Sequence, residues 1–354
     1  METTREDEFA GQRESAEAVN PEVDIVCRPG EVVPWETFCD EKVYPGHAIA
    51  LDGYVAGPSN FARSPSGVIK ANFDHHQKRR IDLHSTCGQV YIHITQGLMD
   101  NVRRQRVRVY VNDADPDTTL SAWLLRNHRL VEGVRHEPRI SALVHAEDLL
   151  DATAGAYPFD VQSPLLKKMA YMFNPYVQRR LQNNLHTLTA EEMQNLIDEG
   201  CRRIDQYLAL GDAAPELELD TRYEPIPGGG GPGWAMIKEI GYWARTRLFN
   251  EGIRSFVSVR DIGDGTFVYS LGKMSPYEPF PLEDFYSDCN REDGILPGDP
   301  DRWNGGDTIG GPPRKRRTRI TPVRLTHIIN ERLLRAMKHP LPAGEGRASR
   351  SERG

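Results

Sequence analysis

The stretch VRVYVNDADPDTTLSAWLL, residues 107–125, is the part of the chain that decides its fold. It opens with Val107 to Val111, an apolar run of strand length, and continues into NDADPD, residues 112–117, which contains three aspartates. A helical pattern then runs from Thr118 to Asn127. A buried strand that leads through a polar loop into a helix is the unit from which α/β folds are built.

The same order of elements occurs elsewhere in the chain. His47 to Leu51 and Ile140 to Val144 are also apolar runs of strand length, and acidic residues follow both of them. Helical patterns run from Ser85 to Asn101 and again after Asp151. This alternation predicts an α/β domain with a largely parallel sheet, in which ligands bind at the carboxyl ends of the strands.

Length and composition predict about two domains and a cytoplasmic location. The chain has 354 residues and a net charge of −7, which repels a polyanion at long range but permits local basic patches. Its five cysteines never occur in a CxxC spacing, which argues against a disulfide framework and against a cysteine zinc site. No apolar run approaches the roughly 20 residues that cross a bilayer, and the acidic start lacks the pattern of a signal peptide. We therefore expect a soluble protein without a membrane partner.

Changes in composition suggest where the domains begin and end. Residues 1–22 and 337–354 are polar and lack apolar periodicity, which predicts disordered tails. Thr189 to Glu192 is a capping box that opens a long amphipathic helix, and the glycine-rich stretch from Glu224 to Gly233 predicts a linker or an exposed loop. We expect an α/β domain at 23–160, a helical connector at 161–227 and a smaller α+β domain at 228–336.

The first candidate site is Asp74-His75-His76, which follows a short apolar stretch. Carboxylate and imidazole are the usual ligands of hard or borderline divalent metals, and adjacent histidines can divide between a metal and a substrate phosphate. Neighbouring histidines are also common on protein surfaces. The triplet alone therefore does not define a site.

A second acidic group follows the strand at 107–111. Asp115 and Asp117, two residues apart in an extended turn, can present their carboxylates to the same side. The alternative is that Asp117 only caps the helix that follows and that the other acids are solvated. That alternative explains one aspartate and leaves its neighbours unexplained, so a metal site is favoured.

Two more acidic groups follow apolar runs. Asp52 ends the run that starts at His47, and the segment from His145 to Asp151 follows the run that ends at Val144. Carboxylates gathered at strand ends are costly to bury without cations nearby. Divalent metals would supply those cations.

With these residues identified, the chain resembles the DHH phosphoesterase superfamily, which includes RecJ-like exonucleases, nanoRNases, cyclic-dinucleotide phosphodiesterases and family II pyrophosphatases. The resemblance covers roughly residues 48–155 and 228–336. In that family a DxD motif that opens a helix, a lone strand-end Asp, the DHH triplet and a later Asp bind two manganese or similar ions. The matching residues here are Asp115 and Asp117, then Asp52, then Asp74, His75 and His76, and finally Asp148 or Asp151.

The chain departs from the family pattern in two respects. The DxD motif normally precedes the DHH triplet, whereas here it follows, which implies a circular permutation or a different role for Asp115 and Asp117. The family also carries a ligand His just before DxD, and this chain has Asp113 there. A rival first motif at Phe38 to Glu41 is similar to the Myg1-like branch, but Pro45 and Gly46 follow it closely and disfavour a helix.

A glycine-rich and basic region near the C-terminus resembles the GG motif of the DHHA1-type substrate-binding domain. Glycine lets a backbone approach a phosphate closely, and arginine binds phosphate oxygens in a bidentate manner. A basic run is also typical of a solvated surface, and that alternative stays open. The candidate substrate-binding residues in this region are Gly305, Gly306, Gly310, Gly311, Arg314, Lys315 and Arg316.

The resemblance implies hydrolysis of a phosphodiester or phosphomonoester of a nucleotide or short oligonucleotide by a water activated between two divalent ions, Mn²⁺ or Mg²⁺. His75 would be a ligand, and His76 would bind the phosphate or protonate the leaving oxygen. The runner-up substrate is pyrophosphate or polyphosphate. A noncatalytic nucleotide sensor with a degenerate metal site is an alternative of another class, and either form is compatible with a homodimer.

Overall fold

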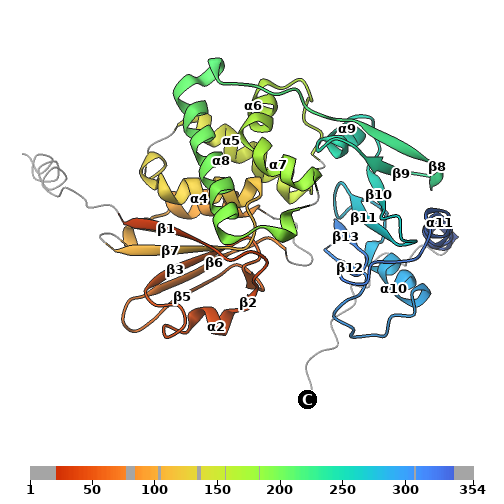
Figure 1. Ribbon diagram of the computed structural model, residues 1–354, viewed down its shortest axis with the longest axis horizontal. Coiled ribbons are helices and arrows are strands. Elements are labelled where there is room, and N and C mark those ends of the chain that lie inside the picture. Colours follow the sequence, from red (N-terminus) through yellow and green to blue (C-terminus); the bar gives the residue numbers. More distant parts are fainter. Residues whose placement is uncertain are drawn as a thin grey trace, which may run out of the picture. The chain divides into compact units, whose positions relative to one another are not determined.

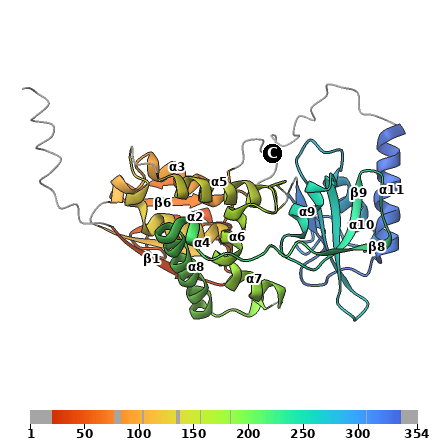
Figure 2. The same ribbon diagram turned by 90° about the horizontal axis from the view of Figure 1, so that it is seen from above.

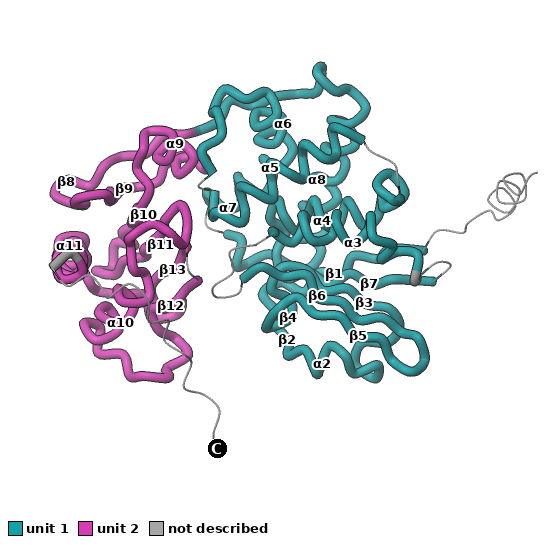
Figure 3. Tube along the Cα trace, turned by 180° about the vertical axis from the view of Figure 1, so that it is seen from behind, with its two compact units in different colours: residues 1–220 teal, residues 221–354 magenta. Residues whose placement is uncertain are grey.

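A computed structural model describes residues 21–76, 84–102, 105–133, 137–155, 157–182, 184–306 and 308–338. The chain forms two compact units, residues 1–220 and 221–354, each with its own main sheet (Figure 3). Nearly all of the two predicted disordered tails lies outside the described residues. The region predicted as a helical connector, 161–227, is divided between the units, because the first unit extends to Asp220.

The first unit contains a sheet in the order β1-β7-β3-β6-β5 (Figure 1). Four neighbouring strands are parallel, and the edge strand β5 is antiparallel to β6. The predicted α/β class with a largely parallel sheet is therefore confirmed for this unit. The strands are β1 (Glu22–Cys27), β3 (His47–Leu51), β5 (Asn60–Arg63), β6 (Ile69–Phe73) and β7 (Arg106–Val111).

The central strands of this sheet are buried on both faces, as is usual for parallel strands. On one face, Ala50 and Tyr110 pack with Phe38 of helix α2 (Trp35–Cys39) in an aromatic cluster that also contains Tyr54. Phe38 is fully buried there. The rival first motif at Phe38 to Glu41 thus begins with a core residue at the end of a helix, and a turn rather than a helix follows it.

Three helices that bear on the site pack against one another: α3, α4 and α5. The predicted helix after the acidic loop is α4, which begins with Asp115 as its N-cap and Pro116 in its first turn. The helix predicted from Ser85 to Asn101 is shorter in the structure and is followed by a 3-10 turn (Met99–Val102). The bounds are α3 (Thr86–Thr95), α4 (Pro116–Arg126) and α5 (Pro138–Ala152).

The prediction of a strand at Ile140 to Val144 is wrong. These residues lie in α5, where Pro138 occupies the first turn and loses no hydrogen bond there. An apolar run of five residues is compatible with a strand or with one face of a helix, and here helical spacing continues beyond the run. The buried positions are Ile140, Leu143, Val144, Ala146, Glu147 and Leu150. The acids at 147–151 therefore lie on a helix and not at a strand end.

The remaining helices of the first unit follow α5 in sequence. The predicted capping box is confirmed, because Thr189 and Glu192 each hydrogen-bond the backbone of the other. The helix that it opens, α8, contacts both α4 and β1. The elements are α6 (Pro164–Met172), α7 (Asn174–Leu181) and α8 (Ala190–Leu210), with short strands β2 (Val33–Pro34) and β4 (Val55–Ala56) elsewhere in the unit.

The second unit is built on a mixed sheet in the order β12-β13-β11-β10-β9-β8. Its core is aromatic and aliphatic, with Phe285 and Trp303 almost fully buried. The long helix α11 lies beside β8, as Figure 2 shows. The elements are β8 (Tyr223–Gly231), β9 (Trp234–Glu239), β10 (Ser255–Asp261), β11 (Phe267–Lys273), β12 (Asn304–Gly305), β13 (Ile309–Gly311), α9 (Ala244–Asn250), α10 (Leu282–Glu292) and α11 (Pro322–Lys338).

The prediction that Glu224 to Gly233 forms a linker or loop is also wrong. Most of this stretch is the edge strand β8, which pairs with β9 through a bulge between Pro225 and Gly230. An edge strand tolerates proline because one side of its backbone has no strand to bond. Within the described residues, no helix has the length and apolarity required to cross a membrane.

Candidate metal centre

The carboxyl ends of three adjacent parallel strands carry the predicted site residues. β7, β3 and β6 are neighbours in the sheet, although β7 comes last of the three in the chain. The loop after β7 carries Asp113 and Asp115, Asp52 follows β3, and Asp74-His75-His76 follows β6. Adjacent strand order thus brings the segments together even though their order along the chain differs from that of the DHH family.

Asp52 lies at the centre of this arrangement and its side chain is 5% exposed. Its backbone has a φ of 48°, a conformation that residues other than glycine rarely adopt, and it turns the chain sharply out of β3. One carboxylate oxygen accepts from Thr86 Oγ1 at 3.3 Å and the other from Thr118 Oγ1 at 3.4 Å. These contacts fix the carboxylate between the starts of α3 and α4.

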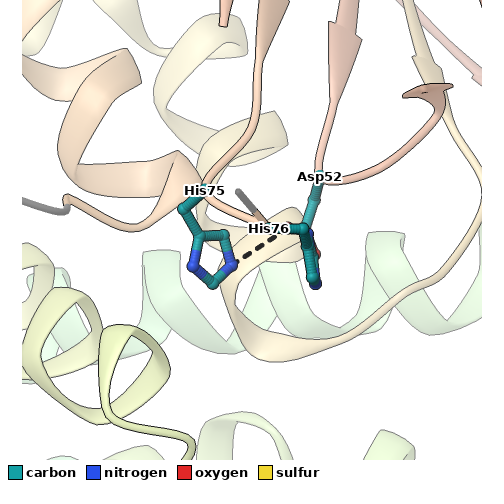
Figure 4. Close-up of side chains that lie close together, drawn as sticks. All are labelled: Asp52, His75 and His76. Carbon is teal, nitrogen blue, oxygen red and sulfur yellow. Dashed lines mark ion pairs between the residues drawn. The ribbon is translucent and has the colours of Figure 1, made fainter. Parts of the chain in front are cut away.

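His75 joins Asp52 to α5. Its Nε2 lies 3.3 Å from Asp52 Oδ1 and 2.8 Å from Asp151 Oδ2 (Figure 4 shows the pair with Asp52). Burial alone would lower the pKa of His75, but the charges of Asp151 and Asp52 raise it well above its usual value. The same histidine lowers the pKa of Asp52 to about 2, against the effect of burial, which would raise it.

His76 is more exposed, with 60% of its side chain open to solvent. Its Nδ1 lies 2.8 Å from Asp74 Oδ1, and this hydrogen bond raises the pKa of His76. The backbone of Asp74 is in turn fixed by Ser59 Oγ, which accepts from its N–H and donates to its carbonyl. Gln89 donates to the same carbonyl at 3.0 Å. Asp74 therefore orients His76, and two polar side chains orient Asp74.

Asp117 is fully buried, and its carboxylate lies at the start of α3. It accepts from Ser85 Oγ at 2.9 Å, from Thr86 N at 2.8 Å and from Cys87 N at 2.7 Å. The alternative in which Asp117 caps its own helix is wrong, because Asp115 is the N-cap of α4. Asp117 instead satisfies free N–H groups of a neighbouring helix.

The two candidates for the fourth ligand differ in their surroundings. Asp148 accepts from Ser85 N at 2.6 Å, and its other oxygen lies 2.8 Å from His84 Nδ1. It also packs so closely on Gly88 that a Cβ there would lie 2.6 Å from its carboxylate. Asp151 faces His75, and its buried Oδ2 has no directed hydrogen bond within the described part of the chain. Asp151 is the acid with an oxygen available to a ligand.

The gathered acids perturb one another. Burial, followed by the charges of Asp52 and Asp113, raises the pKa of Asp115 well above its usual value. Burial and the charge of Asp151 raise the pKa of Asp117 to about 7. Burial and the same Asp151 raise the pKa of Glu147 well above its usual value. Such mutual destabilisation of carboxylates is what a bound cation relieves.

The donor set fits a divalent metal. Among the described residues, two groups place one ligand atom of each member within 4.8 Å of the others: Asp52, His75 and His76, and His75, Asp117 and Asp151. Carboxylate oxygen and imidazole nitrogen suit manganese, iron and zinc, and carboxylate alone suits magnesium. Asp74, Asp113, Asp115 and Asp148, which the sequence also suggests as ligands, lie outside these two groups.

Comparisons of the chain with protein-family models, with curated proteins and with solved structures found no match. The assignment of this site therefore depends on its geometry and on the chemistry of its donors.

The predicted glycine-rich motif lies in the second unit and forms the short strands β12 and β13. A Cβ at Gly305 would lie 2.3 Å from Gly310 Cα, and one at Gly310 would lie 2.0 Å from Tyr286 Oη. A Cβ at Gly311 would lie 2.5 Å from the Tyr269 carbonyl oxygen, so these three glycines have a packing role. Gly306 is less crowded, because a Cβ there would lie 3.8 Å from the Ile309 carbonyl oxygen.

The basic run after the glycines is partly neutralised. The Arg316 side chain pairs with Asp299 and Asp301, and Asp301 also accepts from the backbone N–H of Lys315. Arg314 is exposed. Because Arg316 is engaged in ion pairs, it fits a solvated surface better than a substrate-binding site. Arg314 remains the stronger candidate for substrate binding.

Several residues around the site were not identified from the sequence. Tyr176 of α7 donates to Asp113 Oδ2 at 3.4 Å, and Ser59 and Gln89 hydrogen-bond Asp74. Local sequence gives no sign of these three, since each reaches the site through tertiary packing. Glu147 belongs to the acidic segment expected from the sequence, and the structure buries it four residues before Asp151 on the same face of α5.

Proposed function

We propose that this chain is a metal-dependent phosphoesterase, related to the DHH phosphoesterases by a circular permutation, that hydrolyses phosphoesters of nucleotides or short oligonucleotides. The observation that carries the proposal is the position of His75. It lies between two groups of possible ligands that come from adjacent strand ends and from the start of α4 and the end of α5. His75 Nε2 would bind one ion, and the carboxylates of Asp52, Asp117 and Asp151 around it would supply the oxygen ligands for that ion and for a second one.

The proposed ligands are Asp52, His75, Asp117 and Asp151, with Asp115 close to Asp52. Two divalent ions held there, Mn²⁺ or Mg²⁺, would activate water for attack and neutralise charge on the phosphoryl group. The mixed imidazole and carboxylate donors favour Mn²⁺ over Mg²⁺. Asp151, the proposed fourth-motif ligand, supplies an anionic oxygen that faces His75 at 2.8 Å.

The chain's own acid–base group is His76. Asp74 accepts a hydrogen bond from Nδ1, so this nitrogen keeps its proton and Nε2 is directed away from Asp74. When protonated, Nε2 can donate to a phosphoryl oxygen and pass its proton to the leaving oxygen. The exposure of His76 leaves that edge of the ring accessible to a substrate.

A nucleotide substrate is favoured over pyrophosphate because the chain has two units, the second with a glycine-rich segment, and this two-domain form resembles the nucleotide-cleaving branches. Pyrophosphate or polyphosphate is the runner-up. A noncatalytic sensor is the alternative without turnover.

The test is Mn²⁺-dependent hydrolysis of bis(p-nitrophenyl) phosphate and of a short RNA by the full chain. We expect His75→Ala and Asp151→Asn each to lower kcat/KM by more than about a hundredfold, because each removes a ligand. His186→Ala, which alters an exposed histidine outside the site, is the matched control and keeps wild-type activity.

Activity that survives in both ligand variants would show that the site is elsewhere. Tight nucleotide binding without turnover in any divalent metal would favour the sensor. Faster hydrolysis of pyrophosphate than of any nucleotide would favour the runner-up.

A further inference from the structure

Helix α7 contacts the acidic loop of the site through a hydrogen bond. Tyr176 Oη donates to Asp113 Oδ2 at 3.4 Å, and Asp113 Oδ1 accepts from the next amide, Ala114 N, at 2.7 Å. Both oxygens of Asp113 therefore have donors from the protein. Asp113 lies outside both groups of possible metal ligands, and its hydrogen bond to Tyr176 holds α7 against the loop after β7.

Arg180 follows Tyr176 by four residues, so the two side chains lie on the same face of α7. That face is directed to the loop that carries Asp113. Burial and Asp52 raise the pKa of Asp113, and the Arg180 charge is close enough to oppose them. Arg180 is nevertheless exposed. A guanidinium thus lies beside the acidic site and remains accessible to solvent.

The neighbouring Arg179 has a different environment. Its guanidinium lies 3.6 Å from Glu192 at the start of α8. Both arginines lie in the last turn of α7, where a helix dipole favours a cation, so that effect is common to the two. Both lie within one turn of Tyr176. What separates them is that Arg179 is half-buried against Glu192, whereas Arg180 is exposed and its charge acts on Asp113.

We propose that Arg180 binds a phosphoryl oxygen of the substrate, so that the first unit itself supplies a phosphate-binding arginine. This inference rests on the proposed function, because a phosphoester held at the site is what would bring phosphoryl oxygens to Arg180. Guanidinium is suited to the task, since its planar set of donors matches two oxygens of one phosphate and stays charged at any physiological pH. The Tyr176–Asp113 hydrogen bond positions the helix, and Arg180 makes the contact.

The experiment measures binding of inorganic phosphate to the full chain loaded with Mn²⁺, by equilibrium dialysis, for wild type and three variants. We expect Arg180→Ala to weaken phosphate binding by about tenfold or more, the effect of a lost charged hydrogen bond. Arg180→Lys keeps the charge and recovers part of the affinity. Arg179→Ala, the matched control on the same helix turn, stays within about twofold of wild type.

A second readout separates substrate binding from a structural effect. In steady-state hydrolysis we expect Arg180→Ala to raise KM by a factor similar to the loss in phosphate affinity, with a smaller change in kcat. Circular dichroism of each variant checks that α7 is retained.

The outcomes test the role of Arg180 separately from the proposed phosphoesterase activity. If wild type hydrolyses phosphoesters but Arg180→Ala and Arg179→Ala behave alike in both assays, the role of Arg180 is rejected and the proposed function stands. If wild type neither hydrolyses a phosphoester nor binds phosphate, both are rejected.

Discussion

The two sheets of this molecule differ in what lies at the ends and faces of their strands. The parallel sheet of the first unit places acids and histidines at adjacent carboxyl ends, and several of these acids are buried. The sheet of the second unit is covered by a continuous aromatic and aliphatic core. In the same unit, the buried Arg245 of α9 is paired with Glu239, and the buried Lys273 of β11 donates to backbone carbonyls.

The difference shows how structural and functional charges can be told apart. In the second unit each of these buried cations has a partner that satisfies it, which is the usual arrangement of a structural charge. In the first unit, burial and the charge of Asp151 raise the pKa values of Asp115, Asp117 and Glu147, so their charges lack a compensating cation. A cluster that is unfavourable for folding is a candidate for ligand binding.

The largest effect on stability should come from the core of the second unit. Phe285 is fully buried and packs edge-on against Phe280, so we expect Phe285→Ala to cost about 3–5 kcal/mol. Hydrogen exchange should accelerate in β10 and β11 and stay unchanged in β7 and α4, because this core contains residues of the second unit only.

Tyr277→Ala is the matched control, since Tyr277 is 73% exposed in the same unit. Equal acceleration in both units after Phe285→Ala would mean that they unfold together and that the comparison between them does not extend to stability.

A smaller loss is expected for Asp117→Ala in the first unit. Three donors at the start of α3 lose their acceptor, which we expect to cost about 2–4 kcal/mol in urea unfolding, reduced by relief of repulsion from Asp151. Asp117→Asn retains acceptor capacity and should recover much of this stability while still weakening Mn²⁺ binding. If Asp117→Asn bound Mn²⁺ as tightly as wild type, Asp117 would be a helix-capping residue alone.

The smallest change in stability is expected for Asp148→Asn, and comparison with Asp151→Asn tests which of the two residues binds the metal. We expect Asp148→Asn to cost about 1 kcal/mol, because it weakens the contacts to Ser85 and His84, and to leave the rise in melting temperature on adding Mn²⁺ intact. Asp151→Asn should abolish most of that rise, because it removes a proposed ligand. Thermal shifts with and without chelator measure both. The reverse pattern would assign the fourth ligand to Asp148.

Much of the first unit follows from local sequence. The strands β3 and β7 show as short apolar runs, and the start of α4 shows as an acidic cap followed by proline. The site residues Asp52, His75 and Asp117 are predictable because they follow short apolar runs. The strand predicted at Ile140 was wrong because five apolar residues do not distinguish a strand from the buried face of a helix.

The remaining errors concern partners that are distant in sequence. The glycine-rich stretch becomes β8 because β9 provides hydrogen bonds to it, and composition carries no sign of that partner. Asp148 was indistinguishable from Asp151 because the choice depends on Ser85 and His84, which come from another segment. The sequence gives no sign of Arg180 because α7 reaches the site through tertiary contacts such as the Tyr176–Asp113 hydrogen bond.

The order of strands also governs when the first unit can form during synthesis. β7 lies between β1 and β3, yet it emerges from the ribosome after β1, β3 and β6. Until residues 106–111 are available, β1 has no described partner in the sheet and β3 has one open edge. Unpaired edges invite aggregation, and pairings that are distant in sequence form slowly. The exposure of these edges in the nascent chain therefore lasts until β7 is synthesised.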